Sequence, residues 1–156
     1  MRIRSACNSD SGDVRELVFD ILRAYGLQPD PAKTDRDLDD VESSYHNAGG
    51  YFAVLEDEHG ELIGTYGLAR TGDRECELRK MYLTAAHRGK GLGQMLLEDA
   101  LRQAERLGFS VVTLETASVL KEAIALYRKY GFEPYASSHL SARCDKAYRK
   151  VLGGGR

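Results

Sequence analysis

Apolar residues along the chain recur with two different periods, and each change of period marks the boundary of an expected element. Spacings of three and four residues predict four helices, at 11–25, from Thr34 to Tyr45, at 91–107 and at 120–130. Alternating or continuous apolar segments predict strands at 1–6, 51–56, 61–70, 76–84, 110–116, 132–135 and 144–151. The order β-α-α-β-β-β-α-β-α-β-β is typical of an α+β protein, in which an antiparallel meander is followed by a strand–helix–strand crossover.

Length and composition agree with one domain that has its own core. The chain has 156 residues, 42% of them hydrophobic and 29% charged. We assign residues 1–152 to this domain and expect 153–156 to form a disordered tail, because that segment has nothing to bury. The formal net charge of −2 argues against a protein that coats nucleic acids.

The ends and the apolar runs indicate a cytoplasmic protein. The first residues contain no apolar signal-peptide core, and no apolar run approaches the roughly 20 residues of a membrane helix. We therefore expect neither secretion nor a membrane partner.

The residues that most often bind metals are widely separated here. They are Cys7, Cys76, Cys144, His46, His59, His87 and His139. No two of them have the spacing of a zinc site, so we expect three reduced thiols and no metal.

A glycine-rich turn joins the strand at 76–84 to the helix at 91–107. Its sequence is Arg88-Gly89-Lys90-Gly91-Leu92-Gly93. Glycines allow a bulky ligand to approach the backbone, and free N–H groups at a helix start attract anions. Together with two basic side chains, this pattern predicts a pyrophosphate site, although a plain glycine-rich turn remains the alternative. A Rossmann site fits poorly because the turn follows a meander, and no GxxxxGK[ST] motif is present.

At these residues the chain resembles the GNAT acetyltransferase superfamily. Residues 88–93 are similar to its [Q/R]-x-x-G-x-[G/A] acetyl-CoA signature, and 122–132 (EAIALYRKYGF) to its A-I-x-L-Y-x-x-x-G-F motif. The resemblance covers 51–135 most firmly. It implies a mixed, mostly antiparallel central sheet, flanked by about four helices, whose fourth and fifth strands (76–84 and 110–116) splay apart.

The resemblance implies acetyl-CoA as the cosubstrate, with no metal. Backbone groups of Met81 and Leu83 would pair with the pantetheine arm, and N–H groups between Arg88 and Gln94 would hold the pyrophosphate. Leu120 stands where many family members have Asn, and Ser118 is the expected substitute. The full set of expected cofactor-binding residues is Met81, Tyr82, Leu83, Arg88, Gly89, Lys90, Gly91, Leu92, Gly93, Gln94, Ser118, Ala123 and Tyr127.

The same resemblance suggests catalytic roles. Tyr127 occupies the position of the family tyrosine that protonates the leaving thiolate, the alternative being an aromatic residue of the core. Glu77 is the expected base, or else a surface carboxylate beside Arg79, and Glu115 is a second candidate. A backbone N–H near Met81 is expected to stabilise the oxyanion.

The implied activity is transfer of an acetyl group from acetyl-CoA to a primary amine by direct attack in a ternary complex. We expect the acceptor to be a small amine or an amino-acid-like metabolite, and the protein to be a possible homodimer. Acetylation of protein N-termini or lysines is the alternative acceptor class. A non-catalytic acyl-CoA sensor is the alternative of another class.

An acidic run at 35–42 has two interpretations. It is a solvated helix face, or it attracts a cationic acceptor through Asp39 and Asp40.

Overall fold

The computed structural model describes residues 1–138 and 140–153, and within that part of the chain seven strands form one sheet. The strands are β1 (Arg2–Ser5), β2 (Tyr51–Glu56), β3 (Leu62–Gly72), β4 (Glu75–Leu83), β5 (Val111–Thr116), β6 (Glu133–Pro134) and β7 (Lys146–Val151). Their spatial order is β1-β2-β3-β4-β5-β7-β6, and β4 and β5 are the one parallel pair among them. The expected α+β class with a mostly antiparallel sheet is therefore confirmed. Of the expected tail, all but Gly153 lies outside the described residues.

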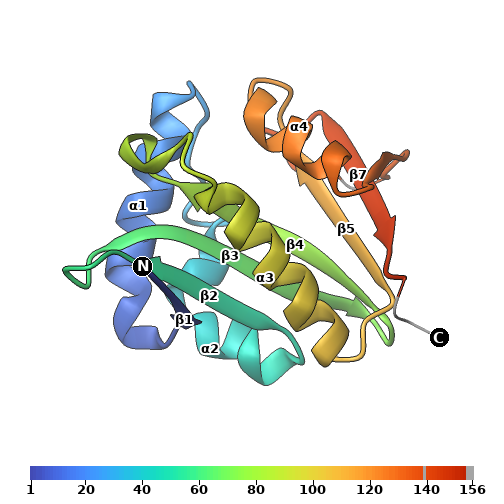
Figure 1. Cartoon of the computed structure of the whole chain (residues 1–156), viewed down its shortest axis with the longest axis horizontal. Coiled ribbons are helices and arrows are strands. Elements are labelled where there is room, and N and C mark those ends of the chain that lie inside the picture. Colours follow the sequence, from blue (N-terminus) through green and yellow to red (C-terminus); the bar gives the residue numbers. More distant parts are fainter. Residues whose placement is uncertain (139, 154–156) are drawn as a thin grey trace.

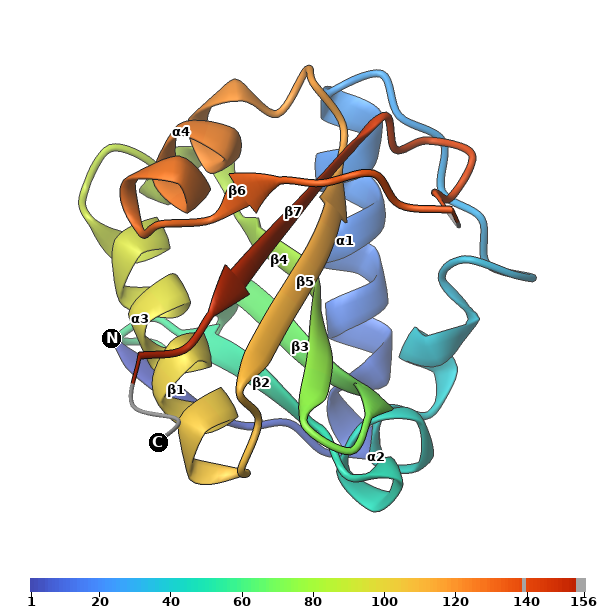
Figure 2. The same cartoon turned by 90° about the vertical axis from the view of Figure 1, so that its right-hand side faces the viewer.

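Four helices cover the two faces of the sheet. They are α1 (Ser11–Ala24), α2 (Val41–Ser44), α3 (Leu92–Arg106) and α4 (Lys121–Lys129). Figure 2 shows α1 and α2 on one face and α3 and α4 on the other. Each face has its own core, because the apolar stripe of each long helix packs onto the side chains that point toward it.

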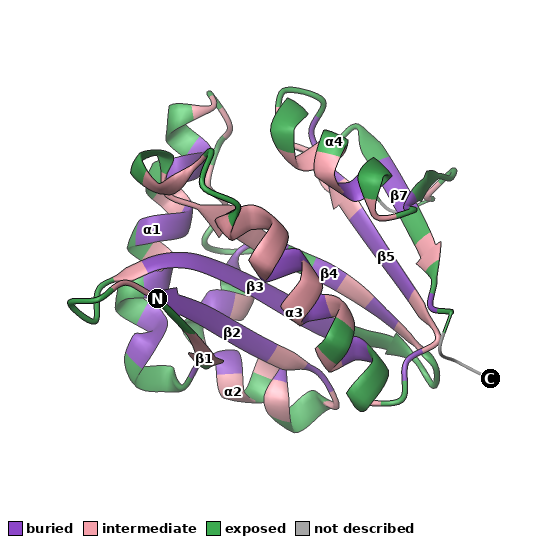
Figure 3. Ribbon diagram, viewed as in Figure 1, coloured by how far each residue is buried: buried purple, intermediate pink, exposed green. Residues whose placement is uncertain are grey.

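The two cores explain the burial pattern of the sheet. In α3, Leu96, Leu97, Ala100 and Ala104 are buried against the sheet. On the opposite face the buried residues of α1 and α2 pack with those of β2. The central strands are consequently buried over most of their length, and the outer sides of the helices are exposed (Figure 3).

The central parallel pair is only partly joined. Strands β4 and β5 pair from Glu75 with Val111 as far as Leu78 with Leu114, and β4 then continues to Leu83 without further pairs to β5. Strand β5 is paired on its other edge with β7 along its whole length. The sheet therefore divides after Leu78, as Figure 1 shows where β4 and β5 separate.

The prediction of one continuous helix from Thr34 to Tyr45 was wrong. The segment contains a 3-10 turn at Arg36–Asp39 and then the four-residue α2. Asp40, at φ −151° and ψ 81°, interrupts the helical path, and its carboxylate accepts a hydrogen bond from the N–H of Ser43. Leu38, Val41 and Tyr45 are nevertheless fully buried, so the apolar spacing identified the inward-facing residues correctly.

Two aromatic side chains pack closely against Gly67 of β3. A Cβ atom there would lie 2.8 Å from Phe52 Cδ2 and 2.8 Å from Tyr45 Cε1, and both side chains are fully buried. We expect Gly67→Ala to lower the free energy of unfolding by about 1–3 kcal/mol, because neither ring can move away without disturbing the core. Urea titration followed by circular dichroism measures the change.

Gly72→Ala is the matched control, since it lies in the same strand and a Cβ there would come no nearer than 3.7 Å to another heavy atom. Its effect should stay within about 0.5 kcal/mol. Equal stabilities of the two variants would contradict this account of the core.

Candidate functional site

A cavity of about 310 Å³ lies where β4 and β5 separate. Its walls come from the end of β4, the end of β5, the glycine-rich turn, the inner side of α4 and the C-terminal part of α1. Ten of the expected cofactor-binding residues line it: Met81, Tyr82, Leu83, Arg88, Gly89, Gly91, Gly93, Gln94, Ala123 and Tyr127. Lys90, Leu92 and Ser118 are not among the lining residues, and neither is Glu77. The structure thus brings most of the set together around one space.

A bulge in β4 shapes the wall opposite β5. The register between β3 and β4 shifts between Thr65 and Gly67, and Lys80 adopts φ +54°, the only positive φ of a non-glycine residue among those described. The hydroxyl of Thr65 donates a hydrogen bond of 2.7 Å to the Lys80 carbonyl. Strained backbone of this kind persists only where several contacts hold it. The bulge lies next to Met81, which lines the cavity.

The glycine-rich turn presents the start of α3 to the other end of the cavity. Gly89 and Gly91 have φ values of +77° and +78°, which L side chains rarely adopt. Met95 donates the first backbone hydrogen bond of the helix, to the carbonyl of Gly91. The N–H groups of Leu92, Gly93 and Gln94 precede it and have no acceptor within the helix. This end therefore combines free donors with the positive end of a helix dipole.

The side chain of Arg88 contacts two other elements of the protein. Its Nε donates a hydrogen bond of 3.1 Å to the carbonyl of Leu83, and its guanidinium lies 5.0 Å from the centre of the Tyr25 ring. Arg88 therefore joins the end of β4 to α1 along the cavity wall. Lys90 is exposed and leaves a positive charge near the helix start.

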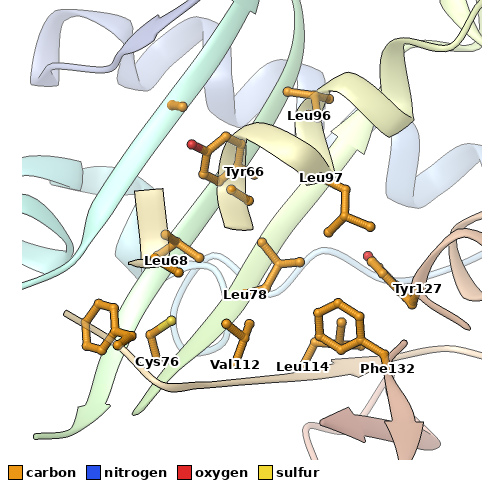
Figure 4. Packing of buried hydrophobic residues seen from close by; sticks show 14 of the residues in the cluster. Tyr66, Leu68, Cys76, Leu78, Leu96, Leu97, Val112, Leu114, Tyr127 and Phe132 are labelled. Carbon is orange, nitrogen blue, oxygen red and sulfur yellow. The ribbon is translucent and has the colours of Figure 1, made fainter. Parts of the chain in front are cut away.

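Tyr127 extends from α4 into the space beside the sheet. Its residue is 5% exposed, and its ring packs at 5.7 Å against Phe132 (Figure 4). Burial raises the pKa of the Tyr127 hydroxyl well above its usual value, and the nearby Tyr82 and Cys144 raise it further. The hydroxyl is therefore protonated at any physiological pH.

Two carboxylates lie on the same face of the separated strands. Glu77 pairs in the sheet with Thr113, and Glu115 lies two residues farther along β5. The Glu77 carboxylate is ion-paired with Arg79 Nε. The Glu115 carboxylate accepts a hydrogen bond of 3.0 Å from the N–H of Ser141 and lines the cavity. Only Glu115 therefore faces the cavity directly.

Lys80, Arg143 and Cys144 are among the lining residues that were not anticipated from the sequence. Lys80 belongs to β4, and Arg143 and Cys144 belong to the segment between β6 and β7. Burial raises the pKa of the Cys144 thiol. Burial also raises the pKa of Tyr82, to about 12, and the charge of Arg143 opposes that shift. Isolated charges and a lone cysteine carried no sequence signal, because their partners are distant along the chain.

Three other residues that the sequence suggested for the site lie outside the cavity wall. The hydroxyl and the N–H of Ser118 both bind the Asp145 carboxylate, at 2.7 and 2.8 Å. Asp39 is ion-paired with Arg15 on the surface, and Asp40 binds Ser43 and Asn8. The carboxylates of Asp39 and Asp40 therefore have protein partners and do not line the cavity.

The described residues contain neither a candidate metal cluster nor a candidate membrane span. No group of three or more His, Cys, Asp or Glu residues there could hold a metal ion. Among the same residues, no helix has the length and apolarity needed to cross a bilayer.

The divided sheet, the glycine-rich helix start and the tyrosine of α4 are the features implied by the acetyltransferase resemblance. Residues 15–132 match the family model described as "Acetyltransferase (GNAT) family". The chain is 41% identical over 129 residues to the uncharacterized N-acetyltransferase YjgM of Escherichia coli, an alignment that covers 80% of this chain and 77% of that protein. The chain therefore belongs to the GNAT acetyltransferase family, whose members are acyltransferases that use acetyl-CoA.

Solved structures agree on the fold. A GNAT acetyltransferase from Staphylococcus aureus superposes with a TM-score of 0.90 at 22% identity, over 97% of this chain and 98% of that one. A phosphinothricin acetyltransferase from Sinorhizobium meliloti, in complex with acetyl-CoA, gives a TM-score of 0.76 at 23% identity. The second alignment covers 99% of this chain and 89% of that one.

Proposed function

We propose that the protein transfers an acetyl group from acetyl-CoA to the primary amine of a small molecule, by direct attack within a ternary complex. The observation that carries this proposal is the convergence of three features on one cavity. They are the end of β4 that has no pairs to β5, the free N–H groups of the α3 start and the hydroxyl of Tyr127. The acetyl-CoA complex of the Sinorhizobium enzyme, which shares the fold, supports the same use of the cavity here.

The two ends of the cavity suit the two ends of acetyl-CoA. The helix start would hold the pyrophosphate through the N–H groups of Leu92, Gly93 and Gln94. The edge of β4 from Met81 to Leu83 has no pairs to β5, so its backbone can bind the amide groups of the pantetheine arm. The thioester would then lie near the bulge and Tyr127.

The chemistry needs three contributions from the protein. An N–H at the bulge, near Met81, would stabilise the negative oxygen of the tetrahedral intermediate. A carboxylate would take a proton from the ammonium group of the acceptor, whose pKa is about 10.4 in a free alkylamine, so that the neutral amine can attack. The resulting neutral amine nitrogen forms a bond to the acetyl carbon, the carbon–sulfur bond breaks, and CoA leaves as a thiolate that Tyr127 stabilises. The nitrogen loses a second proton as the amide forms, and the thiolate takes up a proton to become the free thiol.

The raised pKa of Tyr127 sharpens its role. Proton transfer from this tyrosine to the thiolate is unfavourable, because the pKa of the buried hydroxyl lies well above its usual value and that of a thiol is about 8.5. We therefore assign Tyr127 as a hydrogen-bond donor to the leaving sulfur, with the final proton able to come from the amine by way of the base.

One observation favours Glu115 over Glu77 as the base. Glu115 lines the cavity, whereas Glu77 does not and is ion-paired with Arg79. Glu77 remains close enough to contribute, because its charge, like that of Glu115, raises the pKa of Cys144 after the larger effect of burial.

The loops around the cavity favour a small acceptor. Arg143, between β6 and β7, forms a two-point ion pair with Asp35, between α1 and α2, at 2.6 and 2.9 Å. This contact joins the two segments beside the cavity and narrows the approach for a protein chain.

We test the activity by incubating the protein with acetyl-CoA and a panel of amines, amino acids and lysine peptides, and identifying acetylated products by mass spectrometry. Tight binding of acetyl-CoA without any acetylated product would instead support the sensor.

Gly93 tests the pyrophosphate site. Its φ is not positive, and a Cβ there would meet only Leu126 Cδ2, at 3.7 Å, so the fold itself tolerates alanine. We expect Gly93→Ala to keep or raise stability by about 0.5–1 kcal/mol, since alanine is the better helix former. Acetyl-CoA affinity should nevertheless fall by about tenfold or more, because the methyl group lies where the phosphates approach, a loss of about 1.4 kcal/mol.

Gly12→Ala is the matched control for that change. Gly12 is also the second residue of its helix, and a Cβ there meets nothing within 4 Å. Isothermal titration of both variants with acetyl-CoA makes the comparison. Unchanged affinity in Gly93→Ala would remove the pyrophosphate from this turn.

Tyr127 tests the leaving-group role. We expect Tyr127→Phe to lower kcat by about 10²-fold or more while the Kd of acetyl-CoA stays within about twofold, because the hydroxyl acts mainly on the charge that develops in the transition state. Since its pKa is raised, wild-type kcat should show no loss from tyrosine ionisation between about pH 8 and pH 10. Stopped assays of acetylated product across this range measure kcat and its pH dependence, and isothermal titration measures the Kd of acetyl-CoA.

Tyr130→Phe removes a nearby hydroxyl that binds Glu98 instead and does not line the cavity. Its kcat should match wild type. A similar kcat in all three proteins would exclude a catalytic hydroxyl at Tyr127.

The choice of base is tested by two isosteric variants. We expect Glu115→Gln to lower kcat/KM by about 10²-fold at neutral pH and Glu77→Gln by less than about threefold, because only the first removes a proton acceptor from the cavity wall. Raising the pH toward the pKa of the amine should recover part of the Glu115→Gln activity, since more acceptor is then neutral. A larger loss in Glu77→Gln would reverse the assignment.

A further inference from the structure

Asp35 is fully buried and has partners from three parts of the chain. Its two carboxylate oxygens accept hydrogen bonds from Arg143 Nη1 and Nη2, at 2.9 and 2.6 Å. Lys80 Nζ lies 3.4 Å from Asp35 Oδ1, and the N–H of Asp30 donates at 2.8 Å. One carboxylate therefore contacts the bulge of β4 and the segment between β6 and β7 at the same time.

Lys80 is the residue whose conformation makes the bulge. Its φ of +54° is unfavourable for a side chain, and its ammonium group is anchored far from solvent, with the side chain 6% exposed. Besides Asp35, Nζ contacts the carbonyl of Thr34 and both carboxylate oxygens of Asp37, each at 3.2 Å. The segment between α1 and α2 thus holds the side chain of the strained residue.

Arg143 makes the corresponding link from the other side of the cavity. Its side chain is 13% exposed, and it lines the cavity beside Cys144. Apart from Asp35, its guanidinium donates a longer hydrogen bond of 3.4 Å to the carbonyl of Gln28. Asp35 is therefore its main anchor.

Such a group of buried charges is a poor way to gain stability alone. Removing charges from water costs free energy that their mutual attraction only partly returns. A single carboxylate that fixes two cavity-lining cations from distant segments instead gives geometric precision next to the thioester end of the cavity.

We propose that Asp35 is a positioning residue of the acetyl transfer, which couples the acceptor-side segment around Arg143 to the β4 bulge at Lys80. This inference rests on the proposed function, because it assigns the acceptor to this side of the cavity. Loss of the Asp35 charge would leave Lys80 with Asp37, and Arg143 with the Gln28 carbonyl and the Tyr82 side chain. The bulge and the acceptor-side segment would then lose the carboxylate that joins them, and each would move more freely.

The test compares Asp35→Asn with Asp39→Asn. Asp39 belongs to the same segment but is paired with Arg15 at the surface and does not line the cavity. In Asp35→Asn we expect amide hydrogen exchange to become at least about tenfold faster in both residues 80–83 and residues 140–146. The acceptor KM should rise about tenfold or more, with the Kd of acetyl-CoA within about twofold of wild type. Asp39→Asn should change none of these.

Arg143→Gln distinguishes coupling of the two segments through Asp35 from a general loss of rigidity in the protein. It removes one partner and leaves the contacts of Lys80, so exchange should rise in 140–146 but not in 80–83. If Asp35→Asn does not fold, this variant still decides the matter, since it should raise the acceptor KM with the bulge unchanged.

Two results would overturn the proposal. One is unchanged exchange and acceptor KM in folded Asp35→Asn. The other is a uniform rise in exchange over the whole chain with an equal loss of acetyl-CoA affinity, which indicates a purely structural role. If wild-type protein acetylates no amine, the proposed function fails, but the exchange measurement still decides whether Asp35 couples the two segments.

Discussion

The end of pairing between β4 and β5 is the constraint on which the rest of the site depends. The two strands share four register positions and then separate, although each remains held on its outer edge, β4 by β3 and β5 by β7. A sheet divided in this way leaves backbone donors and acceptors facing a cavity rather than a partner strand. A linear ligand with its own amide groups can satisfy them, as we propose for the pantetheine arm of acetyl-CoA.

The two ends of the cavity differ in electrostatic potential. At the α3 start the positive potential comes from free N–H groups and the helix dipole, with Lys90 exposed nearby. At the other end the formal charges are neutralised within the protein, since Lys80 and Arg143 face Asp35 and Asp37. In the proposed arrangement the anionic end of the cofactor would bind at the α3 start, and the reacting groups would lie toward these buried ion pairs.

The sequence predicted the regular elements well because their periods reflect burial. Strand β2 has the expected bounds, and the boundaries of α1, α3 and α4 differ by at most one residue from expectation. The segment before α2 was predicted less well, since its apolar residues keep helical spacing while its carboxylates bind distant partners. Asp35 seemed part of a solvated acidic run, yet its partner Arg143 is 108 residues away. No local pattern encodes such a contact.

The site shows the same division between local and distant information. The glycine-rich turn and Tyr127 belong to motifs that are readable in sequence because each lies within one turn or helix. The proposed preference for Glu115 over Glu77 rests on the cavity wall, which Glu115 lines and Glu77 does not, although the two carboxylates share a face. The precision of the reacting centre is therefore set largely by side chains whose roles follow from the tertiary structure. For this fold, a motif can identify the cofactor end of the cavity, while the acceptor end has to be derived from the buried contacts that shape it.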